Sequence, residues 1–307
     1  MNLKSKISDI IKNGVAEYNQ LFNRNCLGNS YGLARSTLAL GSLITLIFSS
    51  KKTLFDKDIF EYTRSFDLIE DINLFYQLGY NNLHISILIS CLILSLVVLG
   101  VSPRLTCIPH FLVSLGIYKS VSVGEGGDQI TVVLTLLLIP VALMDTRRNH
   151  FSKRELGKSN FYKNSISSIL MKMVIPLQVS FLYLNAGIEK LYKTEEWRNG
   201  TALYYIFKDP LFSSDFLRAD SLVYILNHSY ILVVMTLSTI ALELLLAGIL
   251  FMPYNRRKWF LFVGAAFHFM IIIFFGLVSF FFAMLSALIL YTLRPDQDYN
   301  FSFHKFA

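Results

Sequence analysis

Long apolar runs follow one another from residue 33 almost to the end of this 307-residue chain. A hydrophobic stretch of about 20 residues is long enough to cross the hydrocarbon core of a membrane as a helix. The sequence therefore predicts an all-α, polytopic integral membrane protein that folds as a single domain over residues 1–307. About eight transmembrane helices are expected, at residues 33–50, 82–101, 105–123, 129–144, 166–188, 229–252, 258–275 and 277–293.

Composition supports a membrane protein and argues against a nucleic-acid-binding one. The chain is 54% hydrophobic and only 16% charged, whereas soluble domains carry about 25% charged residues. Its formal charge of +7 has a simple explanation, because Lys and Arg accumulate in the cytoplasmic loops of membrane proteins. We therefore expect lipid contact and no nucleic-acid partner.

The distribution of charge predicts that both termini are cytoplasmic. With eight spans and this orientation, the inner segments hold 16 basic and 6 acidic residues, and the outer segments hold 10 and 14. Basic residues in short loops favour the cytoplasmic side. Two long outer loops, residues 51–81 and 189–228, mix aromatic and charged side chains and are expected to fold as caps over the helices.

Ionisable side chains within spans are costly, so each one is a candidate site unless it can reach the membrane interface. Arg35, Lys172 and Lys119 lie near span ends, where we expect their long side chains to extend to the interface. Glu243 lies near the middle of its span and cannot do so. We therefore expect Glu243 to face other protein groups.

Glu243 and His268 are predicted to contact each other. If the two spans form a hairpin about Asn255, Glu243 lies 12 residues before the turn and His268 lies 13 after it. At 1.5 Å per residue, both lie about 18 Å from the turn, near the middle of the membrane. The pair can join two helices structurally, or it can handle protons or contact a ligand.

A third candidate is Lys190, where the fifth span reaches the outer interface. Tyr183 and Gly187 precede it by seven and three residues and so lie on the same side of a helix. A small residue such as Gly187 lets another helix or a flat ligand approach the backbone. A lysine shielded from water can release its proton and act as a base, but lysine is also an ordinary interface anchor.

The segment Gly124-Glu-Gly-Gly-Asp-Gln precedes the fourth span and includes Asp128 and Gln129. Its glycines can form either a plain tight turn or a loop whose N–H groups bind an anion. The chain has three cysteines but no Cys-x-x-Cys or other zinc-binding spacing, so no metal site is expected.

The stretch Ala-Gly-Ile-Glu-Lys-Leu, followed by Glu-Trp-Arg-Asn-Gly-Thr-Ala-Leu-Tyr-Tyr, resembles a motif of the horizontally transferred transmembrane domain family, which includes vitamin K-dependent γ-carboxylases. Gly-Gly-Asp-Gln-Ile, Leu-Leu-Leu-Ile-Pro-Val-Ala-Leu-Met-Asp and Ala-Leu-Ile-Leu-Tyr near the end of the chain resemble the sporulation-delaying protein B family within it. The resemblance covers nearly the whole sequence.

That resemblance implies a bacterial plasma-membrane protein that matures a secreted peptide toxin together with a small partner protein. It also implies a membrane quinol, menaquinol or a vitamin K-like molecule, with Lys190 as the base and His268 at an intramembrane Phe-His position. Tyr183, Gly187, Asp128 and Gln129 are then candidate cofactor contacts. Where the carboxylases have an Asn-His pair this chain has Gln129-Ile130, which puts glutamate carboxylation in doubt. The alternative function is a non-catalytic scaffold that binds the toxin precursor or partner proteins.

Overall fold

The computed structural model describes residues 8–9, 12–16, 28–66, 70–152, 166–209, 224 and 227–299. Helices dominate this part of the chain, and its β-structure is one isolated bridge between Val101 and Asn149. The residues form two compact units, which we describe separately. Unit 1 contains residues 1–19 and 176–277, and unit 2 contains residues 20–175 and 278–307.

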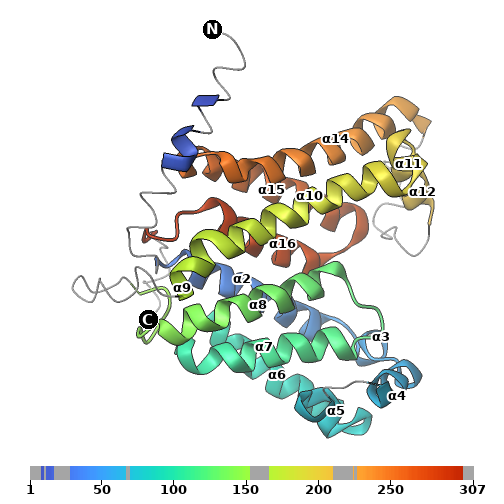
Figure 1. Cartoon of the computed structure of the whole chain (residues 1–307). Coiled ribbons are helices and arrows are strands. Elements are labelled where there is room, and N and C mark those ends of the chain that lie inside the picture. Colours follow the sequence, from blue (N-terminus) through green and yellow to red (C-terminus); the bar gives the residue numbers. More distant parts are fainter. Residues whose placement is uncertain are drawn as a thin grey trace. The chain divides into compact units, whose positions relative to one another are not determined.

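Unit 2 is built around five helices: α2 (Ser30–Phe48), α6 (Leu83–Val98), α7 (Pro103–Ser120), α8 (Gly126–Met144) and α16 (Val278–Thr292). Helix α2 packs against α6 and α16, and α8 packs against α7 and α16 (Figure 1). Thus α16, although distant in sequence, completes the same bundle as the amino-terminal helices.

Two glycines allow the backbones of unit 2 to approach closely. A Cβ atom at Gly41 would lie 2.7 Å from Cβ of Phe282, and one at Gly127 would lie 2.6 Å from Cα of Phe280. Real Cβ atoms do not approach other atoms so closely. The absence of a side chain at these two positions therefore sets the spacing of α16 from α2 and α8.

Unit 1 contains two consecutive apolar helices and, from Pro176 onward, the part of the long helix that carries Lys190. Helix α14 (Ser229–Gly248) continues through the 3₁₀ turn η6 (Ile249–Phe251) and is followed by α15 (Tyr254–Phe275). Arg257 closes this turn, since its guanidinium donates to the carbonyl oxygens of Leu250 and Met252. The predicted turn between these two spans is therefore present, just before Asn255, which lies in the first turn of α15.

The long helix begins with α9 (Ile166–Ile169), passes through the π-helical stretch η4 (Leu170–Val174), and continues as α10 (Ile175–Lys193). It is followed by two short helices, α11 (Glu195–Arg198) and α12 (Ala202–Lys208). Both short helices contact α14, and they lie where α10 ends in Figure 1. Residues 210–223 of the predicted outer loop lie outside the described residues.

Six segments of the described chain are long and apolar enough to cross a membrane, and they coincide with the predicted spans. They are Ser30–Phe48, Tyr80–Val98, Gly126–Leu143, Ile166–Lys193, Ser229–Phe251 and Tyr254–Phe275. The two other predicted spans also form helices, but α16 is shorter and α7 falls outside this set. The chain is therefore an all-α polytopic membrane protein.

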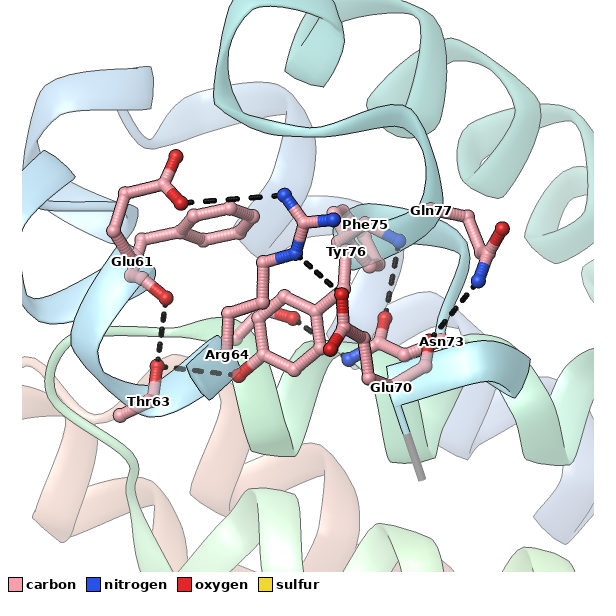
Figure 2. A network of polar contacts seen from close by, with 10 residues as sticks. Glu61, Thr63, Arg64, Glu70, Asn73, Phe75, Tyr76 and Gln77 are labelled. Carbon is pink, nitrogen blue, oxygen red and sulfur yellow. Dashed lines mark hydrogen bonds and ion pairs between the residues drawn. The ribbon is translucent and has the colours of Figure 1, made fainter. Parts of the chain in front are cut away.

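The predicted cap at residues 51–81 is folded in its described part. It consists of α3 (Lys51–Leu54), α4 (Lys57–Phe66), η1 (Glu70–Ile72), α5 (Leu74–Leu78) and η2 (Tyr80–Asn82). Figure 2 shows its polar network, in which Arg64 Nε donates to Glu70 Oε1 at 2.7 Å. Asn73 and Tyr76 attach the cap to the end of α7 by donating to Ser120 Oγ and to the carbonyl oxygen of Lys119.

The basic residues within the spans behave differently from one another. Lys119 is exposed, as the sequence predicts. Arg35 and Lys172 are 1% and 0% exposed, so the prediction that they extend to the interface is wrong. Arg35 instead donates to Thr106 Oγ1 at 2.8 Å, because the face of α2 that carries it packs inside the bundle.

Candidate functional site

Lys190 and Glu243 form an ion pair between α10 and α14 in unit 1. Lys190 Nζ lies 2.7 Å from Oε1 and 2.8 Å from Oε2 of Glu243. The two side chains are 21% and 10% exposed, so the pair is largely shielded from water. Glu243 therefore faces other protein groups, as its position in the apolar sequence predicts.

Tyr183 and His268 form a second polar pair, between α10 and α15. The Tyr183 hydroxyl lies 2.9 Å from His268 Nε2, and the two residues are 1% and 2% exposed. The prediction that Glu243 and His268 contact each other is therefore wrong. Glu243 pairs with Lys190, and His268 pairs with Tyr183. Equal depth in a hairpin does not make two side chains face each other, and here each one faces α10 instead.

Gly187 lies between Tyr183 and Lys190 in sequence and packs against side chains of α14. A Cβ atom there would lie 2.8 Å from Leu244 Cδ2 and 3.6 Å from Cβ of Glu243. Of the two uses predicted for a small residue here, the structure shows the approach of another helix. Its assignment as a cofactor contact remains a prediction.

Trp197 is a site neighbour that the sequence argument treated only as part of a motif. Lys190 Nζ lies 5.2 Å from the centre of its indole ring, within the range of a cation–π contact. The helical spacing used to find Tyr183 could not place Trp197, because α10 ends at Lys193 and α11 begins at Glu195. Only the turn between these helices brings the indole to Lys190.

The arrangement gathers five different polar or aromatic groups in unit 1. These are an amine, a carboxylate, a phenol, an imidazole and an indole, from Lys190, Glu243, Tyr183, His268 and Trp197. The Lys190 charge also acts electrostatically on His268. Such a set can hold and transfer a proton, since carboxylate, amine and imidazole all serve as acids or bases. No group of three possible metal ligands is present in the described part of the chain.

Asp128 and Gln129 belong to unit 2, at the start of α8. Asp128 accepts a hydrogen bond from the backbone N–H of Glu125 at 3.1 Å, and the two residues form a reciprocal capping box. Ser279 donates to the Glu125 carboxylate at 2.5 Å, whereas Gln129 is exposed. The glycine-rich segment thus begins a helix, and a cofactor role for Asp128 and Gln129 remains a prediction.

Comparison with known proteins identifies relatives over most of the chain. It is 36% identical to sporulation-delaying protein SdpB of Bacillus subtilis (strain 168) over 270 residues, which cover 88% of this chain and 82% of that protein. It is also 33% identical to the uncharacterized protein YitO of the same strain, over 91% of this chain and 90% of YitO. No family model and no solved structure matches the chain. This level of identity over nearly full length shows that the chain belongs to the family of sporulation-delaying protein SdpB.

Proposed function

We propose that this protein is a plasma-membrane component of a bacterial sporulation-delaying toxin system and acts in maturation of the secreted peptide toxin. Family membership supports the toxin system, and the helices support a membrane location. The proposal also includes two partners, the toxin precursor and a small protein of the same system. Both termini lie in the cytoplasm in this proposal, which the distribution of basic residues supports.

The observation that carries a chemical role is the shielded ion pair of Lys190 and Glu243, with Nζ 2.7 Å from the carboxylate. Transfer of one proton from Lys190 to Glu243 converts the ion pair into a neutral amine and a neutral carboxylic acid. A site of low dielectric constant disfavours charged groups, which supports this transfer in our proposal. The free amine of Lys190 can then accept a proton from a bound molecule.

A membrane quinol fits the chemical groups of this site. Its hydroxyl groups suit the donors and acceptors of Lys190, Tyr183 and His268, and its flat ring suits the indole of Trp197. When bound, a quinol supplies two electrons from the membrane pool. In our proposal Lys190 accepts the proton that leaves a quinol hydroxyl and so regains its charge, while Glu243 holds the proton that Lys190 released beforehand.

A non-catalytic scaffold is the second candidate, and one observation favours it. Gly187 packs directly against α14 beside Glu243, so the ion pair also serves as a clamp between two helices. In that case Lys190 stabilises the membrane domain, and the protein presents the toxin precursor to another enzyme.

The substitution Lys190→Arg separates the two functions. Arginine keeps the charge and can bind the Glu243 carboxylate through two N–H groups, but it does not lose its proton at any working pH. Lys193→Arg is the matched control, because Lys193 lies on the same helix and pairs at 2.8 Å with exposed Glu189.

Mass spectrometry of the secreted peptide provides the readout. Cells that lack the protein should release a peptide of altered mass or none, and cells with the Lys193→Arg protein should release the mature form. If Lys190 acts as a base, the Lys190→Arg protein should reach normal abundance but fail to produce the mature peptide. Normal maturation by this variant would reject the base and favour the scaffold.

A further inference from the structure

One side of α10 carries exposed side chains at a regular spacing. Gln178, Phe181, Asn185 and Ile188 are all exposed, and the steps between them are three, four and three residues. This alternation is the heptad pattern by which two helices pack along a common seam. We call these four residues the α10 seam.

The α10 seam lies opposite the face of the helix that unit 1 buries. Val179 and Tyr183 are each 1% exposed, and Gly187 packs against side chains of α14. Side chains two residues apart, such as those of Tyr183 and Asn185, point about 200° apart around the helix axis. The seam is therefore available for a contact that is separate from the Lys190 site.

Two of the seam residues place an amide at the depth of the membrane interior. Ser180 Oγ donates to a backbone carbonyl of α14 at 2.8 Å, and Gly187 contacts α14 farther along. Helix α14 belongs to an apolar span of 23 residues. Gln178 and Asn185 each lie two residues before one of these contacts, so both amides lie alongside this span.

Exposed amides at this depth need a hydrogen-bonding partner. Lipid tails offer no hydrogen bonds, and a polar group is unfavourable where it makes none. Glu189 interacts with the Asn185 side chain, but an amide has two N–H donors and an acceptor oxygen, so this contact leaves part of its capacity unused. Polar side chains of membrane helices commonly meet such a need by hydrogen bonding to a neighbouring helix.

We propose that the α10 seam is the interface of a homodimer, in which α10 packs in parallel against α10 of a second copy. All copies enter the membrane in one orientation, so a two-fold axis along the membrane normal places each seam residue against its own counterpart. Two facing amides satisfy each other, since each is both donor and acceptor. A different protein would have to supply polar groups at both depths, whereas a second copy supplies them by symmetry.

Disulfide cross-linking in native membranes tests whether two seams meet. Cys26, Cys91 and Cys107 are replaced by alanine, and Ile188→Cys is introduced, which keeps both amides of the seam. Leu245→Cys is the matched control, because Leu245 is 45% exposed but lies on α14. After oxidation with copper phenanthroline, the Ile188→Cys protein should form a product with the mass of two chains, and the Leu245→Cys protein should not.

Sedimentation of the purified full-length protein in detergent measures the dissociation constant of the dimer. Asn185→Leu should raise this constant about threefold or more, as expected for the loss of a hydrogen bond between membrane helices. Asn185→Gln should stay close to the wild type, because it keeps an amide. Ser238→Ala is the control, since Ser238 is exposed on α14 and donates within its own helix, and it should leave the constant unchanged.

Several outcomes would overturn the homodimer. The Ile188→Cys protein would then give no cross-link, or would link to a chain of different mass, which would assign the seam to lipid or to another protein. A wild type that sediments as a monomer at every concentration would reject the interface, and so would an Asn185→Leu protein that dimerises as tightly as the wild type. These measurements do not involve toxin maturation, so their result is independent of the proposed function.

Discussion

Both carboxylate oxygens of Glu243 lie within 2.8 Å of Lys190 Nζ, although 53 residues separate the two in sequence. The positive charge of Lys190 therefore lies directly against the negative charge of Glu243. The pair joins α10 to α14, and in the proposed function it is also the route by which Lys190 loses and regains a proton. Substitutions can separate these two roles. A structural role requires only that the two side chains attract each other, whereas a chemical role also requires that Lys190 can lose its proton.

Glu243→Leu should reduce membrane abundance, because it leaves the largely shielded Lys190 ammonium without its partner. Removing one member of a fully buried ion pair costs about 3 to 5 kcal/mol, and we expect less here because the Lys190 side chain is 21% exposed. Glu243→Gln should retain most of the protein, since its amide oxygen still accepts from Lys190. Quantitative immunoblotting of membranes provides the measurement, and the double variant Lys190→Met with Glu243→Leu should recover part of the loss. Equal abundance of all three variants would contradict a stabilising pair.

Tyr183→Phe should destabilise unit 1 by about 1 to 3 kcal/mol, since it removes the hydroxyl that His268 Nε2 contacts in a buried position. Thermal unfolding of the purified protein, followed by tryptophan fluorescence, would measure the change. Tyr192→Phe is the control, because Tyr192 lies on the same helix and is 82% exposed. An identical Tm for both variants would show that the Tyr183–His268 contact contributes nothing to stability.

Gly127→Ala should lower the stability of unit 2, because the added Cβ would lie 2.6 Å from the backbone of Phe280. Overpacking of this kind costs about 1 to 3 kcal/mol. Gly126→Ala is a closely matched control in the same helical turn, since its Cβ would make an ordinary contact, 3.7 Å from the Phe280 ring. Thermal unfolding should rank the proteins as wild type and Gly126→Ala above Gly127→Ala, and the reverse order would refute the close approach of α8 to α16.

Membrane orientation can be measured by labelling single cysteines with an impermeant maleimide. Cys26, Cys91 and Cys107 are first replaced by alanine, and a cysteine is then introduced at Arg148 or at Glu195, both of which are exposed. The charge distribution predicts labelling of intact cells at residue 195 but not at residue 148. The opposite pattern would place Lys190 at the cytoplasmic side and reject an outer site.

The sequence by itself determined the helical membrane fold. The length and the hydrophobicity of an apolar run can be read directly from the sequence. In a membrane such a run forms a helix, because the helix satisfies the hydrogen bonds of its own backbone. They therefore located the helices, and the turn between α14 and α15, within a few residues. The cost of a charged group in an apolar span likewise identified Glu243 as a residue that must face protein.

Tertiary structure alone decided which side chains meet. The depth of a residue in the membrane follows from its number along the helix. Successive side chains, however, point about 100° apart around the helix axis. Helix packing decides which of these directions faces a given neighbour. Glu243 and His268 both face α10, so they bind Lys190 and Tyr183 instead of each other. For the same reason Arg35 lies inside the bundle, where it donates to Thr106, although its position near a span end predicted contact with the interface.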